Sequence, residues 1–353
     1  SAQGGVDSPV PADLLFMGRA LELAACGLYS ARPNPAVGCV IVRNGVVVGE
    51  GWHERAGGPH AEVHALAQAG ERARGSDMYV TLEPCSHHGR TPPCADAVIA
   101  AGISRVRVAM QDPNPKVSGA GIARLRAAGL QVEVGGEFEE GVRDLNRGFI
   151  SRMTRGRPWV TLKLAASADG RTALASGESR WITGPDARAD VHRMRARAGA
   201  VLTTSATVLA DDPELTVRDF VPPPGVELRQ PDRIVLDRNR RVPKSAKVWR
   251  EDGARTFHIT DGDLHSAMKN LAQQEVNEVL VECGPRFAGA LLQAQLVDEL
   301  VLYLAPSLLG DAARPLAYLP GIDTLAQRVQ LHWVEACKIG ADLRLTAVTA
   351  PPF

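Results

Sequence analysis

Two short blocks constrain this chain most: His60-Ala61-Glu62, and Pro84-Cys85 followed by Cys94. One imidazole and two thiolates form a three-ligand set for zinc. Zinc prefers four ligands, so a water would complete the shell, which is the layout of a catalytic rather than a structural site. The fold must therefore bring His60, Cys85 and Cys94 to one point.

Glu62 follows the histidine by two positions and is placed to handle protons rather than to bind metal. Zinc makes hydroxide available near neutral pH, and Glu62 would take the water proton and return it to the ring nitrogen and the leaving amine. The order H-x-E, then P-C and a second Cys, is typical of zinc nucleobase deaminases. The alternative, a capping or buried histidine and two core thiols, does not account for this order, with each residue at a helix start.

Several neighbours of this set have open roles. His64 lies one helical turn after His60 and is either a fourth ligand or a packed residue. His87 and His88 lie between the cysteines and are ligands, substrate-facing groups or simply exposed. Glu83 is either a second proton shuttle or a structural carboxylate. Cys94 follows two prolines at an expected helix start, where the helix dipole favours a thiolate.

Composition narrows the class of protein. The 353 residues fit two domains better than one, and 40 basic residues balance 40 acidic ones. Without a basic excess, small-molecule substrates are favoured over nucleic acid. No apolar run is long enough to span a membrane, and residues 1–12 lack a signal-peptide pattern; we expect them to be disordered or tag-derived. Six scattered cysteines indicate a reduced cytoplasm rather than a disulfide framework.

The pattern of residues 13–153 predicts an α/β domain. Apolar runs flank Arg43-Asn44-Gly45, and Asn-Gly is a strong hairpin signal. Strands and helices then alternate, which predicts a layered sheet with helices on its faces. Helices are expected at 13–29, 60–70, 93–101, 119–128 and 137–153, and strands at 37–42, 46–52, 78–82, 105–110 and 130–134.

After a polar turn at 154–158 the pattern restarts, so residues 154–353 are expected to form a second α/β domain. Strands are expected at 159–165, 200–203, 233–237, 279–282 and 300–305, helices at 186–198 and 286–296, and a proline-rich loop at 221–232. Residues 282–289 are a strand end, a glycine turn and a helix start. Such a turn exposes backbone N–H groups to a phosphate, although a glycine turn alone is weak evidence for a nucleotide site.

The chain resembles the bifunctional deaminase/reductase family of riboflavin biosynthesis. The first half does so through HAEVHAL (60–66), TLEPCSHHGRTPPC (81–94), PNPAVGCVIV (33–42) and MQDPNP (110–115). Many related deaminases have P-C-x-x-C, whereas eight residues separate Cys85 from Cys94 here. The second half does so through LKLAASADGRTA (162–173), GESRWITG (177–184), TSATVLADDPELTVR (204–218), ECGPRFAGALL (282–292) and LVDELVLYLAPSLLG (296–310).

The resemblance implies a cytidine-deaminase-like zinc domain at 13–153. It would remove the 2-amino group of 2,5-diamino-6-(5-phosphoribosylamino)pyrimidin-4(3H)-one and leave 5-amino-6-(5-phosphoribosylamino)uracil. His60, Cys85 and Cys94 would hold Zn²⁺, with Glu62 as proton shuttle. The expected substrate contacts are Asn34, His53, His87 and Arg90, although Asn34 beside Pro35 is equally a turn residue.

The resemblance also implies a dihydrofolate-reductase-like domain at 154–353, which would use NADPH to reduce the ribosyl chain to ribityl. Lys163 and Asp211 are the expected polar support at the reacting carbon. The expected NADPH contacts are Ala165, Trp181, Thr207, Asp211, Gly284, Pro285, Arg286, Phe287, Ala288, Gly289 and Ala290. The expected substrate contacts are Ser179, Arg195, Leu215, Arg218 and Glu282.

Structural alternatives remain for three of these residues. In the alternative, Trp181 packs in the core and Arg195 belongs to the solvated face of an arginine-rich helix. Asp211 would then be a turn or cap residue. Two residues depart from the family pattern: Arg238 stands where a small polar residue is expected near the cofactor, and Cys283 where a smaller residue is common. Arg238 leaves the adenosine-side contacts open.

Two other functions compete with this interpretation. An RNA- or nucleotide-editing deaminase is opposed by the neutral charge. A non-catalytic zinc module is opposed by the intact Glu62 and the three-ligand set, because structural zinc takes four protein ligands. The resemblance also implies a homo-oligomer.

Overall fold

The computed structural model describes residues 11–89 and 91–350 and divides the chain into two compact units. The first unit extends to Arg155 and also includes the short segment 223–227. The second unit consists of the other residues from Gly156 onward. Residues 1–10, most of the expected N-terminal tail, lie outside the described residues. No helix in the described ranges combines the length and apolarity that a membrane span requires.

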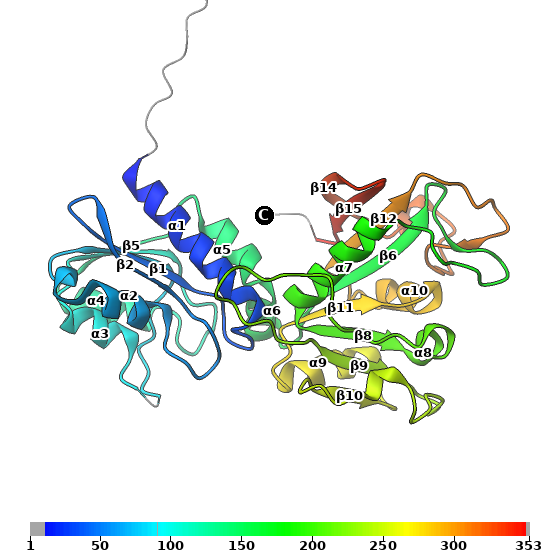
Figure 1. Cartoon of the computed structure of the whole chain (residues 1–353), viewed down its shortest axis with the longest axis horizontal. Coiled ribbons are helices and arrows are strands. Elements are labelled where there is room, and N and C mark those ends of the chain that lie inside the picture. Colours follow the sequence, from blue (N-terminus) through cyan, green and yellow to red (C-terminus); the bar gives the residue numbers. More distant parts are fainter. Residues whose placement is uncertain (1–10, 90, 351–353) are drawn as a thin grey trace, which may run out of the picture. The chain divides into compact units, whose positions relative to one another are not determined.

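The first unit contains one five-stranded sheet with helices on both faces (Figure 1). Its strand order is β2-β1-β3-β4-β5, with antiparallel pairing of β1 to β2 and β3 and parallel pairing from β3 onward. The strands are Gly38–Arg43 (β1), Val46–Trp52 (β2), Asp77–Leu82 (β3), Arg105–Met110 (β4) and Gln131–Val134 (β5). The helices are Ala12–Cys26 (α1), Ala61–Ala69 (α2), Cys94–Ala100 (α3), Ala120–Ala127 (α4), Glu139–Leu145 (α5) and Arg147–Arg155 (α6), with 3-10 turns at Gly27–Tyr29 (η1) and Gly70–Ala73 (η2).

Two separate apolar clusters make this unit a three-layer sandwich. Side chains of α2, α3 and α4 pack on one face of the sheet, and those of α1 and α5 pack on the other. The predicted hairpin is confirmed: Asn44 and Gly45 both have positive φ, 51° and 76°, as a two-residue primed turn requires. The single helix expected at 137–153 is instead two helices, α5 and α6, separated at Asn146.

The second unit contains an eight-stranded sheet in the order β10-β9-β8-β11-β6-β12-β15-β14, plus the small pair β13-β7. The strands are Trp159–Ser167 (β6), Arg171–Ala173 (β7), Ala200–Thr204 (β8), Asp232–Leu236 (β9), Thr256–Ile259 (β10), Glu278–Glu282 (β11), Glu299–Ala305 (β12), Arg314–Pro315 (β13), His332–Ile339 (β14) and Asp342–Val348 (β15). The helices are Pro185–Ala198 (α7), Ser205–Asp211 (α8), Leu264–Gln273 (α9) and Pro285–Gln293 (α10), with 3-10 turns at Lys247–Trp249 (η3) and Leu325–Gln327 (η4).

In sheet order, strands β10, β9, β8, β11, β6 and β12 run parallel. Strands β15 and β14 then extend the sheet with antiparallel pairing. Side chains of α9 and α10 join the main apolar cluster on the sheet, and those of α7 join a smaller cluster with β12. The carboxyl ends of β6, β8, β9 and β11 therefore meet at one edge, where ligands bind in parallel α/β sheets. Of the proline-rich loop expected at 221–232, residues 221–231 contain no helix or strand, whereas Asp232 is the first residue of β9.

Candidate functional site

The expected zinc ligands converge in the first unit. His60 is the N-cap of α2 in an extended conformation, Cys85 follows β3, and Cys94 is the first residue of α3. His60 Nδ1 and the two Sγ atoms all lie within 4.8 Å of one another. His60 Nδ1 is 3.1 Å from Cys94 Sγ and 3.7 Å from Cys85 Sγ. Tetrahedral zinc with ordinary Zn–N and Zn–S lengths requires spacings of about 3.6 Å, so the donor set fits this metal.

The start of α3 stabilises negative charge on Cys85. The backbone N–H of Cys94 donates to Cys85 Sγ over 3.2 Å, and Ala95 N–H donates to the Cys85 carbonyl over 3.0 Å. The hydrogen bond from the Cys94 thiol, supported by His60, lowers the pKa of Cys85 to about 4. The same thiol–thiolate bond raises the pKa of Cys94. The pair thus favours one thiolate at neutral pH, as expected for residues that bind a cation.

Glu62 lies in the first turn of α2, beside the three donors but outside their set. Its side chain is buried, with the residue 3% exposed. Burial raises the pKa of Glu62, and a hydrogen bond with Cys94 opposes that rise. A buried carboxyl with a raised pKa next to a metal site is suited to accept and return a proton.

Asn34 and His53 form a polar pair beside the metal ligand. His53 is 2% exposed; its Nδ1 lies 3.0 Å from the Pro59 carbonyl, and its Nε2 lies 3.0 Å from Asn34 Nδ2. A neutral His53 donates from Nδ1 and accepts at Nε2, and burial lowers its pKa in agreement with that state. The rings of His53 and His60 are nearly perpendicular, with centroids 5.2 Å apart.

The other histidines of this region do not join the donor set. His64 packs against Gly51 of β2, and its Nε2 is buried without a hydrogen-bond partner. His87 and His88 are exposed in the loop between the cysteines. Arg90, the fourth expected substrate contact, lies outside the described residues.

Glu83 is a structural carboxylate. Its Oε1 accepts hydrogen bonds from the backbone N–H groups of Asp112 and Gly119, and its Oε2 accepts from those of Gly121 and Ile122, at 2.9 to 3.1 Å. The residue is 6% exposed. All four donors lie at or before the first turn of α4, so Glu83 fixes this segment to the turn that carries Cys85.

Asp112 is a functional candidate that sequence reasoning missed. It lies in MQDPNP, the motif quoted above only as a mark of family resemblance. Burial raises the pKa of Asp112, and the charges of His87 and Cys85 act on it. An acidic residue two positions after β4, at the same sheet edge as Pro84-Cys85 after β3, was the available signal.

A second polar cluster lies at the carboxyl end of β11, beside the middle of β6, in the second unit. Glu282 accepts two hydrogen bonds from Arg195, 2.7 Å from Nε and 2.9 Å from Nη2. Lys163 Nζ lies 4.0 Å from Glu282 Oε1. Burial raises the pKa of Glu282, but Arg195 and Lys163 outweigh it and hold that pKa at about 2.

Two arginines meet at Thr216 beside this cluster. Arg195 Nη1 donates to the Thr216 carbonyl over 2.9 Å, and Arg218 Nη1 donates to its hydroxyl over 3.0 Å. Leu215 is buried and has a φ of 56°, a left-handed conformation that turns the chain toward Arg195. The cluster carries more positive than negative groups, which suits a phosphate ester.

The remaining expected reductase residues are spread along the same edge. Trp181 is 68% exposed, so it is not core packing; the Arg188 guanidinium lies 4.1 Å from its ring centroid. Asp211 pairs with Arg180 at 3.9 Å rather than with Lys163. Ala165 lies in β6, Thr207 in the first turn of α8, and Ser179 in an exposed loop.

Residues 284–290 form the N-cap and the first six residues of α10. Gly284 is the N-cap and Pro285 the first helical residue. Gly289 serves packing, because a Cβ there would lie 1.7 Å from the Tyr318 carbonyl oxygen. Cys283 is a partly buried thiol, and desolvation raises its pKa to about 12. The helix start therefore offers backbone N–H groups to an anion at the end of β11.

A cavity of about 400 Å³ extends this edge toward β9 and β10. It is lined by the strand ends and by residues of α9 and α10: Thr204, Ser205, Leu236, Arg238, Asn239, Ile259, Asp261, Gly262, Asp263, Leu264, Ala267, Phe287 and Ala290.

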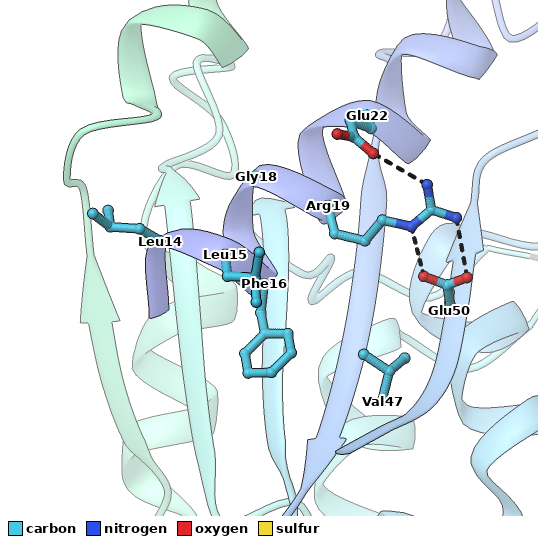
Figure 2. Close-up of a pocket in the computed structure, with 8 residues that line it drawn as sticks. All are labelled: Leu14, Leu15, Phe16, Gly18, Arg19, Glu22, Val47 and Glu50. Carbon is cyan, nitrogen blue, oxygen red and sulfur yellow. Dashed lines mark hydrogen bonds and ion pairs between the residues drawn. The ribbon is translucent and has the colours of Figure 1, made fainter. Parts of the chain in front are cut away.

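Another hollow, of about 510 Å³, lies between α1 and β2 in the first unit. Figure 2 shows Arg19 reaching from α1 to Glu50 on β2, with Glu22 on its other side. Arg19 donates to both carboxylates, and the other lining side chains are apolar. The charged groups here are already paired, so this hollow offers no catalytic set.

Two family models match the chain. One, the cytidine and deoxycytidylate deaminase zinc-binding region, matches residues 11–110, and the other, the RibD C-terminal domain, matches residues 158–345. The Riboflavin biosynthesis protein RibD of Escherichia coli is 50% identical, over 96% of this chain and all of that protein. The protein of the same name from Haemophilus influenzae is 47% identical, over 95% of this chain and 96% of its own length.

Solved structures agree over both units. A structure of Acinetobacter baumannii RibD has a TM-score of 0.90 at 42% identity, covering 96% of this chain and 98% of that one. A diaminohydroxyphosphoribosylaminopyrimidine deaminase/5-amino-6-(5-phosphoribosylamino)uracil reductase from Thermotoga maritima has a TM-score of 0.86 at 35% identity, with the same coverage.

Proposed function

Because this chain belongs to the RibD family, whose members join a zinc deaminase and an NADPH-dependent reductase of riboflavin biosynthesis, we propose which of its residues perform each step. The first step is deamination of 2,5-diamino-6-(5-phosphoribosylamino)pyrimidin-4(3H)-one to the corresponding 5-aminouracil. The second is reduction of its ribosyl chain to ribityl. We assign residues 13–153 to the deaminase and residues 154–353 to the reductase.

The observation that carries the deaminase assignment is a donor triad with a buried carboxyl beside it. His60, Cys85 and Cys94 would hold zinc, which when bound supplies a Lewis acid that makes water a nucleophile at neutral pH. Glu62 would accept a proton from the attacking water and deliver it to the ring nitrogen and the departing amine. Because burial raises the pKa of Glu62, its carboxyl would hold the proton between the two transfers.

The polar groups around the triad would orient the pyrimidine. Both ring nitrogens of His53 are engaged, by Asn34 and by the Pro59 carbonyl, so His53 would hold the Asn34 amide in place and Asn34 would make the polar contact to the pyrimidine. His87 and Arg90 in the loop between the cysteines would meet the ribose phosphate. Asp112, which follows the neighbouring parallel strand β4 at the same sheet edge, would accept a hydrogen bond from an exocyclic amine.

The reductase assignment depends on the Lys163–Glu282–Arg195 cluster. Arg195 and Arg218 would bind the substrate phosphate, with Ser179 and Leu215 shaping the same pocket. NADPH, when bound, supplies the hydride. Lys163 would donate a hydrogen bond to the oxygen at the reduced carbon, with Glu282 holding its ammonium group in place. Asp211 would act at the rim, through Arg180 and Trp181, rather than at the reacting carbon.

Ala165, Trp181, Thr207 and residues 284–290 would contact NADPH, with the pyrophosphate at the start of α10. We also propose a homo-oligomer, which light scattering on the purified chain would test. The cytoplasm is the proposed compartment, because all six cysteines are free and two of them are needed as thiolates.

A paired assay tests both steps on one sample of purified protein. The diaminopyrimidine ribosylamine phosphate is added without dinucleotide, and ammonia is measured; NADPH is then added, and its absorbance is followed. Ammonia first and NADPH oxidation second are expected. Ammonia without oxidation would contradict the reductase assignment, and neither signal from zinc-loaded protein would contradict the substrate.

A further inference from the structure

A buried asparagine between α5 and α6 holds the loop that leads into β1. Asn146 is the C-cap of α5 and is 5% exposed. Its Oδ1 accepts from the Ala36 backbone N–H over 2.7 Å, and its Nδ2 donates to the Ala36 carbonyl over 3.0 Å. Nδ2 also donates to the Val142 carbonyl over 3.3 Å, which keeps the amide on its own helix. One side chain therefore satisfies both backbone polar groups of a buried residue 110 positions away.

Helix α6 holds the same loop, residues 31–37, at a second point. Arg152 Nη2 donates to the Pro33 carbonyl over 3.2 Å. Asn34 follows directly, and its own N–H donates to the Ala31 carbonyl over 3.0 Å. Pro33 and Ala36, the two residues held from outside the loop, therefore lie on either side of Asn34. The α5–α6 segment (residues 139–155) thus fixes the backbone around this expected substrate contact.

The loop also orients the Asn34 side chain through His53. The His53 backbone N–H donates to the Val37 carbonyl over 3.0 Å, and Asn34 Nδ2 lies 3.0 Å from His53 Nε2. Because neutral His53 accepts at Nε2, Asn34 uses its NH₂ group in this bond. None of the described residues bonds Oδ1 of Asn34, which is partly exposed. This oxygen is the group that remains to accept from an amine of the pyrimidine.

The α5–α6 segment lies outside the part of the chain that the zinc pattern identifies. The zinc-binding family model matches residues 11–110, whereas α5 begins at Glu139. Neither Asn146 nor Arg152 belongs to the metal donor set. A displacement of the loop would therefore change how the pyrimidine is held and leave the zinc ligands and Glu62 in place. Such misplacements cost binding and orientation even when the reacting groups are intact.

We propose that the α5–α6 segment, through Asn146 and Arg152, positions Asn34 for the pyrimidine and so sets the substrate affinity of the deaminase. The inference rests on the proposed deaminase function and adds two positioning residues to it. Both act through the backbone of the loop rather than on the substrate. The segment that leads along the chain into the reductase unit is thereby part of the deaminase's binding apparatus.

Steady-state ammonia release by the full-length, zinc-loaded protein tests the proposal. N146A removes both bonds to Ala36, so the KM for the diaminopyrimidine ribosylamine phosphate should rise about 10-fold or more. The kcat should stay within about three-fold, and zinc content should match the wild type, because no ligand or proton shuttle is altered. R152A removes one bond from a partly exposed side chain and should raise KM about three-fold. It keeps the test decisive if N146A does not fold.

V142A is the matched control for a general loss of packing. Val142 lies on α5 one turn before Asn146 and is fully buried in the apolar cluster between the sheet and α1. The variant should lower the unfolding temperature as N146A does, while its KM stays within about two-fold of the wild type.

Three results would overturn the proposal and leave the deaminase assignment intact. These are an unchanged KM in N146A and R152A, equal rises in KM in N146A and V142A, and loss of zinc from folded N146A. The last would show that the segment supports the metal site rather than Asn34. No ammonia release from the zinc-loaded wild type would overturn the proposed function and this inference together.

Discussion

Two buried glutamates flank the cysteine turn of the first unit and use their carboxylates in opposite ways. Glu83 accepts four backbone hydrogen bonds and has no capacity left for chemistry, whereas Glu62 faces the metal donors. The sequence identified Glu62 by its spacing from His60, a local signal. The sequence did not decide between two roles for Glu83, and it did not identify Asp112. The partners of both residues are distant in the chain and are brought to them by the packing of α4 and the segment before it.

Glu62→Gln tests the proton shuttle. The amide keeps the shape of the side chain but cannot accept and return a proton, so ammonia release should fall at least about 100-fold. Zinc content, measured by atomic absorption, should stay at the wild-type level because no ligand is altered. Turnover near the wild-type rate would contradict the assignment.

Cys85→Ser tests the ligand set itself. A serine hydroxyl is a far weaker zinc ligand than a thiolate, so the variant should lose metal during dialysis and lose ammonia release with it. Unchanged zinc content would exclude Cys85 as a ligand.

Glu282 makes the stability of the second unit depend on pH. Its pKa is about 2 in the folded chain and near 4.5 when unfolded, so its contribution is present above pH 4.5 and is lost as the pH falls toward 2. The shift corresponds to about 3 kcal/mol in the free energy of unfolding. Denaturant melts between pH 5 and 2 should show this loss, and Glu282→Gln should flatten it; parallel curves would contradict the ion-pair account.

At the scale of elements, the sequence predicted those whose signals are local. The Asn-Gly hairpin and the alternating strands of both units were predicted to within a few residues. The break between α5 and α6 was not, because Asn146 is held by tertiary contacts: its amide bonds the backbone of Ala36 at 2.7 and 3.0 Å. The sequence also missed helices α8 and α9 and strands β7, β10, β13, β14 and β15. Strand β14 lies at the sheet edge with most residues exposed, so it lacks an apolar run.

Helix α4 approaches the cysteine turn closely only because residue 121 is glycine. A Cβ at Gly121 would lie 1.9 Å from the Pro84 carbonyl oxygen, which is backbone and cannot rotate away. Gly121→Ala should therefore destabilise the first unit by about 1–3 kcal/mol and speed zinc release to a chelator. Gly18→Ala, whose Cβ would meet only the Phe138 ring at 3.3 Å, is the control and should do neither. Equal effects of the two variants would contradict a specific role for this contact.

At the scale of the whole molecule, the chain consists of two units with separate cores and separate sites. The resemblance to one family indicated both units and their order along the chain. The polar turn at 154–158 indicated roughly where the two units divide. The exact position, between Arg155 and Gly156, follows from three-dimensional contacts.

Zinc removal should affect one unit only. Dialysis against a chelator should abolish ammonia release and lower the unfolding temperature of the deaminase unit, because bound metal stabilises the folded state by mass action. NADPH oxidation with the aminouracil product supplied directly should change by less than about two-fold. A parallel loss of reductase activity would show that the units are energetically coupled.

The place of β6 in its sheet has a consequence for synthesis on the ribosome. It is the first strand of the second unit to be made, yet both of its neighbours, β11 and β12, come after residue 277. At about 5–20 residues per second, β6 waits on the order of 10 s for a partner, although the sheet of the first unit has already been synthesised. This apolar strand is therefore the segment on which a nascent-chain chaperone would act longest.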